Sequence, residues 1–231
     1  VVGGGTMGSG IAHVFAQNGY SVTLIEANQQ LIDKALKSIA ANMDRQVAKN
    51  VLTAQAKQEA LARLKPALSL DGAAGADLVV EAVPEVFSIK KEIFTKLDAV
   101  CKPEAILASN TSSLPITSIA AVTRRQDKVI GMHFMNPVPI MKLVELIRGI
   151  ATSDDTFQAV HALTLKLGKT PATSKDFPGF IANRILMPMI NEAAYALMEG
   201  VATEEDIDKV MKMGMAHPMG PLTLDDFIGL D

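Results

Sequence analysis

The sequence predicts an α/β fold in which a doubly wound, mostly parallel sheet carries an inserted helical hairpin and is followed by a smaller all-helical domain. Two observations support this prediction. Short apolar stretches alternate with helical patterns over residues 1–173, the order produced by parallel strands joined through crossover helices. Beyond residue 175 the strand patterns stop and only helical ones remain. The expected domains are therefore residues 1–175 and 176–231.

Composition excludes several classes of function. Of 231 residues, 48% are hydrophobic and 20% charged, which is typical of a globular protein. The net charge is −3 without a basic run, so we expect no nucleic-acid partner. No apolar run approaches the length of a membrane span, so we expect no membrane partner. The single cysteine, Cys101, excludes an internal disulfide framework and favours a reducing, cytoplasmic location.

A glycine-rich turn follows the first apolar stretch. It has the spacing Gly3-x-Gly5-x-x-Gly8, and apolar residues then recur at helical spacing. In a Rossmann-type dinucleotide-binding unit these glycines form the tight turn, let the backbone approach the pyrophosphate, and let the helix pack on the strand. A turn that only packs is the alternative. The expected cofactor-binding residues in this turn are Gly3, Gly4, Gly5, Thr6, Met7 and Gly8.

A second strand, residues 21–25, ends in Glu26, about twenty residues after the glycines. An acidic residue here would hold the adenosine ribose hydroxyls, and it would repel the 2′-phosphate of NADP. No arginine follows closely, so the sequence favours NAD.

A helical hairpin is expected at about residues 30–65, because this region is too long for a simple crossover. Its cations are either a solvated helix face or, in one or two cases, contacts to a phosphate-bearing substrate. They are Lys34, Lys37, Arg45, Lys49, Lys57 and Arg63.

Two buried strands follow, at residues 77–81 and 105–109, separated by an amphipathic helix over residues 88–100. We expect this helix to turn Ile89, Ile93, Phe94 and Leu97 inward. The second strand delivers four small polar residues, 110–113, ahead of a helix that Pro115 starts. Ligands bind at this edge of doubly wound sheets, so these residues predict a polar pocket wall, with a helix cap as the alternative.

Two further strands, residues 129–134 and 141–147, each carry one polar residue in an apolar run: His133 and Glu145. Asn136 begins the Asn-Pro-Val-Pro connector between them. A buried carboxylate needs a partner, and an imidazole held by a carboxylate is a stronger base. The functional hypothesis is an acid/base pair. A core histidine with an unrelated surface glutamate is the alternative.

The last part of the chain is predicted to be helical. A helix at residues 154–167 and a short strand at 170–173 precede a turn-rich linker, residues 175–179. A long apolar helix over residues 180–198 follows, with Asn183 near its start, and residues 203–206 are a capping signal for another helix. Residues 214–221 are expected to form a loop. The apolar content suggests oligomerisation, and the chain is expected to be truncated at both ends.

With these residues in place, the chain resembles the L-3-hydroxyacyl-CoA dehydrogenase family, and within it the bacterial 3-hydroxybutyryl-CoA branch, over essentially its whole length. The motifs that carry the resemblance are residues 3–12, 80–82, 108–114, 133–139, 142–145, 178–184 and 217–221.

The resemblance implies roles position by position. His133 corresponds to the catalytic base and Glu145 to the carboxylate that orients it; Ser112 and Asn183 correspond to residues that contact the reacting part of the substrate. Implied NAD contacts are Glu26, Glu85, Lys90, Ser112 and Asn136. Lys49 aligns with a lysine that meets the CoA phosphates, whereas a neighbouring serine of the family is Asn42 here and is not carried over. Relatives continue into further helices, which implies a homodimer through the C-terminal domain.

The implied reaction interconverts (S)-3-hydroxyacyl-CoA, in the short-chain form 3-hydroxybutyryl-CoA, and 3-oxoacyl-CoA with NAD. Three alternatives remain at this point: a non-catalytic crystallin-like relative, a dehydrogenase for a free hydroxy acid, and a module of a larger β-oxidation protein. Retention of His133, Glu145 and Asn183 argues against the first. Lys49 and the hairpin argue against the second.

Overall fold

The computed structural model describes residues 1–229, and the chain divides into two compact units. The first, Val1–Pro178, is α/β, and the second begins at Gly179 and is helical in its described part. The predicted fold class is therefore confirmed.

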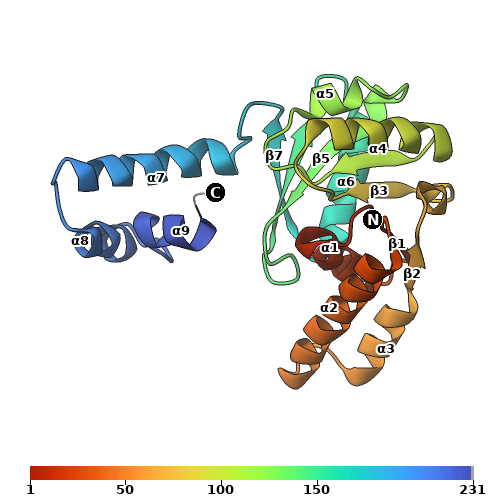
Figure 1. Cartoon of the computed structure of the whole chain (residues 1–231), viewed down its shortest axis with the longest axis horizontal. Coiled ribbons are helices and arrows are strands. Elements are labelled where there is room, and N and C mark those ends of the chain that lie inside the picture. The colour runs from red at the N-terminus through yellow and green to blue at the C-terminus, as the bar shows by residue number, and fades with distance from the viewer. Residues whose placement is uncertain (230–231) are drawn as a thin grey trace. The chain divides into compact units, whose positions relative to one another are not determined.

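The first unit is built on a mostly parallel sheet (Figure 1). The strands are β1 (Val22–Ile25), β2 (Leu64–Ala67), β3 (Leu78–Glu81), β4 (Ile106–Ser109), β5 (Val129–Phe134), β6 (Leu143–Arg148) and β7 (Thr170–Lys175). Strands β3 to β7 are neighbours in chain order, and β1 pairs with β2. Val2 bridges β1 at Ile25 and β3 at Glu81, so the residues before the glycine turn join both groups of strands.

The directions of the strands determine which strand ends share an edge of the sheet. All pairs are parallel except β5 with β6, so β6 and β7 run opposite to the other strands. The carboxyl ends of β1, β3, β4 and β5 therefore share one edge, where ligands of such sheets bind. The amino-terminal end of β6 lies at this same edge.

Helices cover the sheet on two faces (Figure 1). They are α1 (Thr6–Gln17), α2 (Gln29–Ala48), α3 (Ala54–Ala62), α4 (Phe87–Val100), α5 (Ile116–Ala120) and α6 (Asp154–Lys166), with short 3-10 turns at Leu70–Ala73 and Gln126–Lys128. The main core joins Ile130, Met132 and Phe134 of β5 to α1 and α6. Strand side chains alternate between faces, and Gly131 accordingly faces Ile116 of α5.

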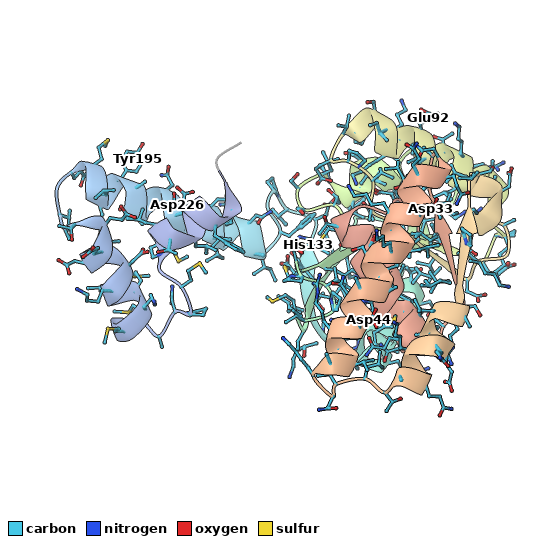
Figure 2. The ribbon with its side chains drawn as sticks, turned by 60° about the horizontal axis from the view of Figure 1, so that its bottom comes forward. Asp33, Asp44, Glu92, His133, Tyr195 and Asp226 are labelled. Atoms are coloured by element: carbon cyan, nitrogen blue, oxygen red, sulfur yellow. The ribbon has the colours of Figure 1, made fainter. Side chains whose placement is uncertain are left out.

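The predicted hairpin is confirmed: α2 and α3 project together from the sheet (Figure 1), and an ion pair of 2.5 Å between Lys57 of α3 and Asp44 of α2 joins them. Figure 2 labels Asp44 on α2. Lys49 caps the carboxyl end of α2, at the tip of the hairpin.

The second unit consists, in its described residues, of α7 (Ala182–Met198), α8 (Glu204–Lys209), a π-helical turn (Val210–Gly214) and α9 (Pro221–Ile228). The predicted cap of α8 is present, because the Thr203 side chain accepts a hydrogen bond from the Asp206 amide. Asp208 then caps α9: its carboxylate accepts hydrogen bonds of 2.9 Å from the amides of Leu222 and Thr223.

Three details differ from the sequence expectation. Strand β2 was not predicted, because Pro66 interrupts its pattern; the structure accommodates the proline because β2 is an edge strand. Helix α9 also went unpredicted. The expectation that Ile89 faces inward was wrong: Ile89 is 39% exposed, and the charged Lys90 occupies the buried position beside it.

None of the helices described in residues 1–229 has the length and apolar character needed to cross a membrane.

Candidate active site

The turn between Val2 and α1 depends on two of its glycines for the fold itself. Gly3 has a φ of +95°, and a Cβ there would lie 2.6 Å from the carbonyl oxygen of Ala82. A Cβ on Gly8 would lie 1.8 Å from the carbonyl oxygen of Gly3. Both contacts are shorter than any real Cβ contact, so α1 packs against the strand only with glycine at these positions.

Gly5 is different, because nothing in the protein requires a glycine there. Its φ is −62°, which any residue adopts, and a Cβ would meet no atom within 4 Å. Gly5 caps α1 without a side-chain hydrogen bond, and the first turn of α1 has no acidic residue. An open backbone at a helix N-terminus suits the pyrophosphate of a dinucleotide.

Glu26 lies directly after β1 and beside this turn. One carboxylate oxygen accepts a hydrogen bond of 2.6 Å from the Gly4 amide, and the other accepts one of 2.9 Å from the Ala27 amide. The carboxylate is thus fixed at the glycine turn, where the adenosine ribose of a dinucleotide would lie. The residues present fit NAD.

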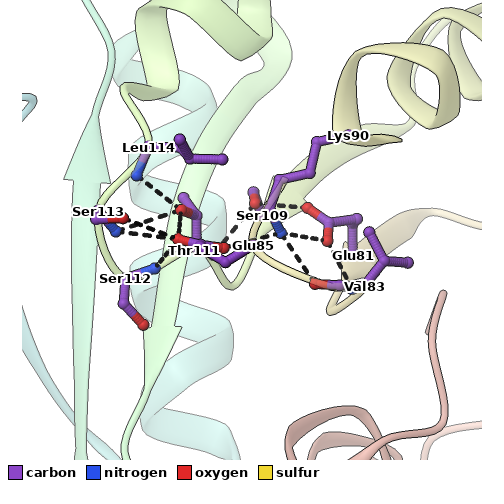
Figure 3. A network of polar contacts seen from close by, with 9 residues as sticks. All are labelled: Glu81, Val83, Glu85, Lys90, Ser109, Thr111, Ser112, Ser113 and Leu114. Atoms are coloured by element: carbon purple, nitrogen blue, oxygen red, sulfur yellow. Dashed lines mark hydrogen bonds and ion pairs between the residues drawn. The ribbon is translucent and has the colours of Figure 1, made fainter. Parts of the chain in front are cut away.

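A buried network follows at the ends of β3 and β4 (Figure 3). The Glu81 carboxylate accepts hydrogen bonds from Lys90 Nζ (2.6 Å), the Val83 amide (2.7 Å) and Ser109 Oγ (2.6 Å). Glu81 is 0% exposed and Lys90 1%. Lys90 Nζ also lies 3.3 Å from Glu85. Sequence reasoning gave Glu81 no role, although an acidic residue closing a buried strand was a visible signal.

Glu85 holds the turn that carries Ser112. Its carboxylate accepts hydrogen bonds from the Ser112 amide (2.9 Å), the Ser113 amide (3.2 Å) and the Thr111 hydroxyl. Burial raises the pKa of Glu85, but the Thr111 hydrogen bond and the charge of Lys90 outweigh it and hold the pKa below its ordinary value. Glu85 is therefore ionised at neutral pH. Thr111 Oγ1 also accepts from the Leu114 amide at 2.9 Å, so the polar segment closes its own turn.

His133 and Glu145 face each other across the antiparallel pair β5–β6. His133 Nδ1 and Glu145 Oε2 are 2.8 Å apart, and Glu145 is only 1% exposed. The alternative of an unrelated surface glutamate is therefore wrong. His133 is labelled in Figure 2. With Nδ1 directed at the carboxylate, the tautomer of the neutral imidazole is set, and its lone pair lies on Nε2.

The strand end bearing His133 is tied to its surroundings. Asn110 Oδ1 accepts a hydrogen bond of 2.9 Å from the Phe134 amide, which joins the end of β4 to the end of β5. Beyond β5, Lys169 Nζ donates to the carbonyls of Val138 (2.5 Å) and Met141 (2.7 Å) in the connector that begins with Asn136. Sequence reasoning did not find Lys169; it follows α6, far along the chain.

The structure thus brings most of the expected site residues to one edge of the first unit. Lys49 is not among them: it is exposed at the hairpin tip, and α2 carries it on the order of 30 Å from its start at 1.5 Å per residue. Asn183 is the second residue of α7, in the second unit. No group of three or more histidine, cysteine or acidic side chains within residues 1–229 is arranged to hold a metal ion.

Comparison with known proteins places the chain. The family model described as the NAD binding domain of 3-hydroxyacyl-CoA dehydrogenase matches residues 1–177, and that of its C-terminal domain matches residues 179–231. The chain belongs to the 3-hydroxyacyl-CoA dehydrogenase family.

Individual members of the family are similar over the whole chain. The 3-hydroxybutyryl-CoA dehydrogenase of Bradyrhizobium diazoefficiens is 55% identical over 100% of this chain and 79% of its own length. The crystal structure of (S)-3-hydroxybutyryl-CoA dehydrogenase PaaH1 from Ralstonia eutropha is 50% identical with a TM-score of 0.97, covering 100% of this chain and 81% of that one. A diketoreductase acting on dicarbonyl compounds is 33% identical with a TM-score of 0.92, covering 100% and 82%.

The predicted family, reaction class and cofactor are confirmed. The chain is an NAD-dependent dehydrogenase of the 3-hydroxyacyl-CoA dehydrogenase family, with NAD as its cofactor. The relatives support this enzyme rather than a non-catalytic crystallin-like protein.

Proposed function

We propose that this dehydrogenase interconverts (S)-3-hydroxybutyryl-CoA and acetoacetyl-CoA, with NAD as hydride acceptor or NADH as donor. The observation that carries the proposal is the 2.8 Å contact between His133 and Glu145 at the sheet edge that also bears the glycine turn. The names of the relatives at about half identity support the choice of substrate.

His133 supplies the proton chemistry. In the oxidative direction its Nε2 takes the proton of the 3-hydroxyl group, and in the reductive direction the imidazolium returns a proton to the forming alkoxide. Glu145, buried against Nδ1, holds the ring in place and stabilises the imidazolium. NAD, when bound, would accept the hydride that C3 of the substrate gives up.

The residues proposed to hold NAD are Gly3, Gly4, Gly5, Thr6, Met7, Gly8, Glu26, Glu85, Lys90, Ser112 and Asn136. The open backbone at Gly5 supports the binding of the NAD pyrophosphate there. The position of the Glu26 carboxylate beside the glycine turn supports its contact with the adenosine ribose. The turn fixed by Glu85 supports a place for Ser112 at the nicotinamide end.

Two side chains, Ser112 and Asn183, are proposed to hydrogen-bond the reacting oxygens of the acyl-CoA. A donor aimed at developing charge contributes about 3 kcal/mol to such a reaction.

Lys49 is proposed to meet the phosphates of CoA, and its exposed position at the hairpin tip leaves its ammonium group accessible to them.

We also propose a homodimer through the helical second unit and a cytoplasmic location. Large apolar side chains exposed on the second unit support the dimer; among them are Met198, Val201, Met213 and Phe227. The single cysteine, which is buried, suits a reducing compartment.

The test is NADH consumption by the purified full-length protein with acetoacetyl-CoA or free acetoacetate, and with NADPH in place of NADH. We expect turnover with the CoA ester and NADH alone. Free acetoacetate is included because one relative is a diketoreductase that acts on dicarbonyl compounds. Equal turnover of acetoacetate would move the assignment to a free oxo acid, and NADH binding without turnover would contradict catalysis.

His133→Ala tests the proposed base directly. We expect a loss of turnover of at least about 100-fold, as for removal of a general acid or base, with NADH binding retained. His161→Ala is the matched control, because His161 lies on α6 and contacts only the ring of Phe157 among the aromatic pairs described. Near wild-type turnover in His133→Ala would end the assignment.

A further inference from the structure

We propose that Glu81 is a positioning residue for catalysis, which acts through Lys90 and Glu85 to hold the turn that carries Ser112. The inference deepens the proposed function, since it rests on Lys90, Glu85 and Ser112 meeting NAD. Glu81 itself touches neither substrate nor cofactor in this assignment.

Glu81 is anchored through both of its carboxylate oxygens. It ends β3, and its register partner in β4 is Ser109, whose hydroxyl donates to Glu81 Oε2 at 2.6 Å. The other oxygen accepts from Lys90 Nζ at 2.6 Å and from the Val83 amide at 2.7 Å. A fully buried carboxylate is costly without such partners, and these contacts offset that cost.

Lys90 transmits the position of Glu81. Its ammonium group lies between two carboxylates, 2.6 Å from Glu81 and 3.3 Å from Glu85. The shorter contact goes to the fully buried partner, whereas the Glu85 side chain is 40% exposed. Glu81 therefore fixes the ammonium, and the ammonium contributes to where the more exposed carboxylate of Glu85 lies.

Glu85 completes a ring of contacts (Figure 3). The ring runs from Glu81 through Lys90 to Glu85, from Glu85 to the amides of Ser112 and Ser113, and back along the chain to Ser109 and Glu81. It joins β3, α4 and β4 at the sheet edge of the site. Without the Glu81 charge, Glu85 is the single carboxylate partner of Lys90 in the ring. We expect the ammonium group then to pull the Glu85 carboxylate away from the turn that carries Ser112.

The experiment is a double-variant cycle in the full-length protein with Glu81→Gln, Lys90→Met and both together. Two readouts are taken: the affinity for NADH, measured by calorimetric titration, and the thermal midpoint. We expect Glu81→Gln to weaken NADH binding about tenfold. The double variant should bind NADH as Lys90→Met does, because Glu81 acts through Lys90. Its thermal midpoint should exceed those of both single variants, because both charges of the fully buried Glu81–Lys90 pair are removed together and neither is left buried alone.

This combination separates positioning from a merely structural role, since in the double variant stability recovers and NADH affinity does not. Glu92→Gln is the matched control: Glu92 lies on the same helix, is 67% exposed in its side chain, and is labelled in Figure 2. Wild-type NADH affinity in Glu81→Gln would overturn the proposal, as would additive losses in the double variant. Failure of the wild-type protein to reduce acetoacetyl-CoA would count against the proposed substrate and leave this binding measurement interpretable.

Discussion

At the scale of single residues, Gly5 and Gly8 show two different reasons for a glycine in one turn. Gly8 is required by the contact of α1 with the backbone of Gly3, whereas Gly5 has ordinary backbone geometry and open space around it. We therefore predict that Gly5→Ala folds with a stability within about 1 kcal/mol of the wild type, because the gain from restricting the unfolded chain is opposed by alanine being a poorer N-cap than glycine. NADH affinity should fall at least tenfold, about 1.4 kcal/mol.

Thermal melting and NADH titration of the same samples check this prediction. Gly75→Ala is the matched control, since a Cβ at Gly75 also meets nothing within 4 Å and the residue lies outside the proposed site. Gly8→Ala should not reach the native fold, because its Cβ would overlap the Gly3 carbonyl. Unchanged NADH affinity in Gly5→Ala would show that no ligand approaches this backbone.

Sequence reasoning identified the His133 and Glu145 pair because the signal is local. Each residue is the polar exception in an apolar strand, and the two strands are close in sequence, so their partnership follows from a hairpin register. The Glu81 network escaped it for the opposite reason. Its members come from β3, α4 and β4, and the buried Lys90 breaks the apolar periodicity that such reasoning relies on.

At the scale of elements, long amphipathic helices and buried strands were predictable because their periodicity reports burial directly. Strand β2 was not, because it is four residues long, contains Pro66 and pairs on one side only. Helix α9 follows a glycine- and proline-rich loop and begins with Pro221. The stabilising contact of α9 is the carboxylate of Asp208, which no local pattern in α9 reveals.

Asp208 carries a prediction for the second unit. Burial raises its pKa, but hydrogen bonds from the Thr223 hydroxyl and the Leu222 amide outweigh this, so the pKa lies below the ordinary value of 3.8. The ionised form is therefore favoured by folding. Its stabilisation is present above about pH 3.8 and is lost as pH falls through the lower folded value. Asp208→Asn should cost about 1–2 kcal/mol at pH 7, in line with loss of a helix cap.

Denaturant unfolding followed by helical circular dichroism, at pH 7 and at steps below pH 3.8, measures the difference between the wild-type and variant proteins. The difference should shrink as pH falls. Asp206→Asn on the same helix is the control, because Asp206 pairs with Lys209 on the exposed surface and should have little effect. A difference that stays constant with pH would contradict the role of the charge.

At the scale of the whole molecule, the proposed dimer makes a prediction that separates the two units. Phe227 of α9 is 78% exposed, and Ile150 of the first unit is 90% exposed. We expect Phe227→Glu to shift the full-length protein from dimer to monomer in sedimentation velocity, because a charge cannot be buried unpaired in an apolar interface. Ile150→Glu should leave the dimer intact. A dimer that survives Phe227→Glu and dissociates with Ile150→Glu would place the interface on the first unit.

The hairpin of β5 and β6 has a consequence for inheritance. His133 and Glu145 are only 12 positions apart, so the proposed acid/base pair is encoded by one short piece of gene. Recombination between related genes would pass both residues on together, already in register. Insertions at the tip of the hairpin would lengthen the connector around Asn136 without shifting the ladder below it. Related enzymes can therefore diverge in the connector while the proposed proton-transfer pair stays unchanged.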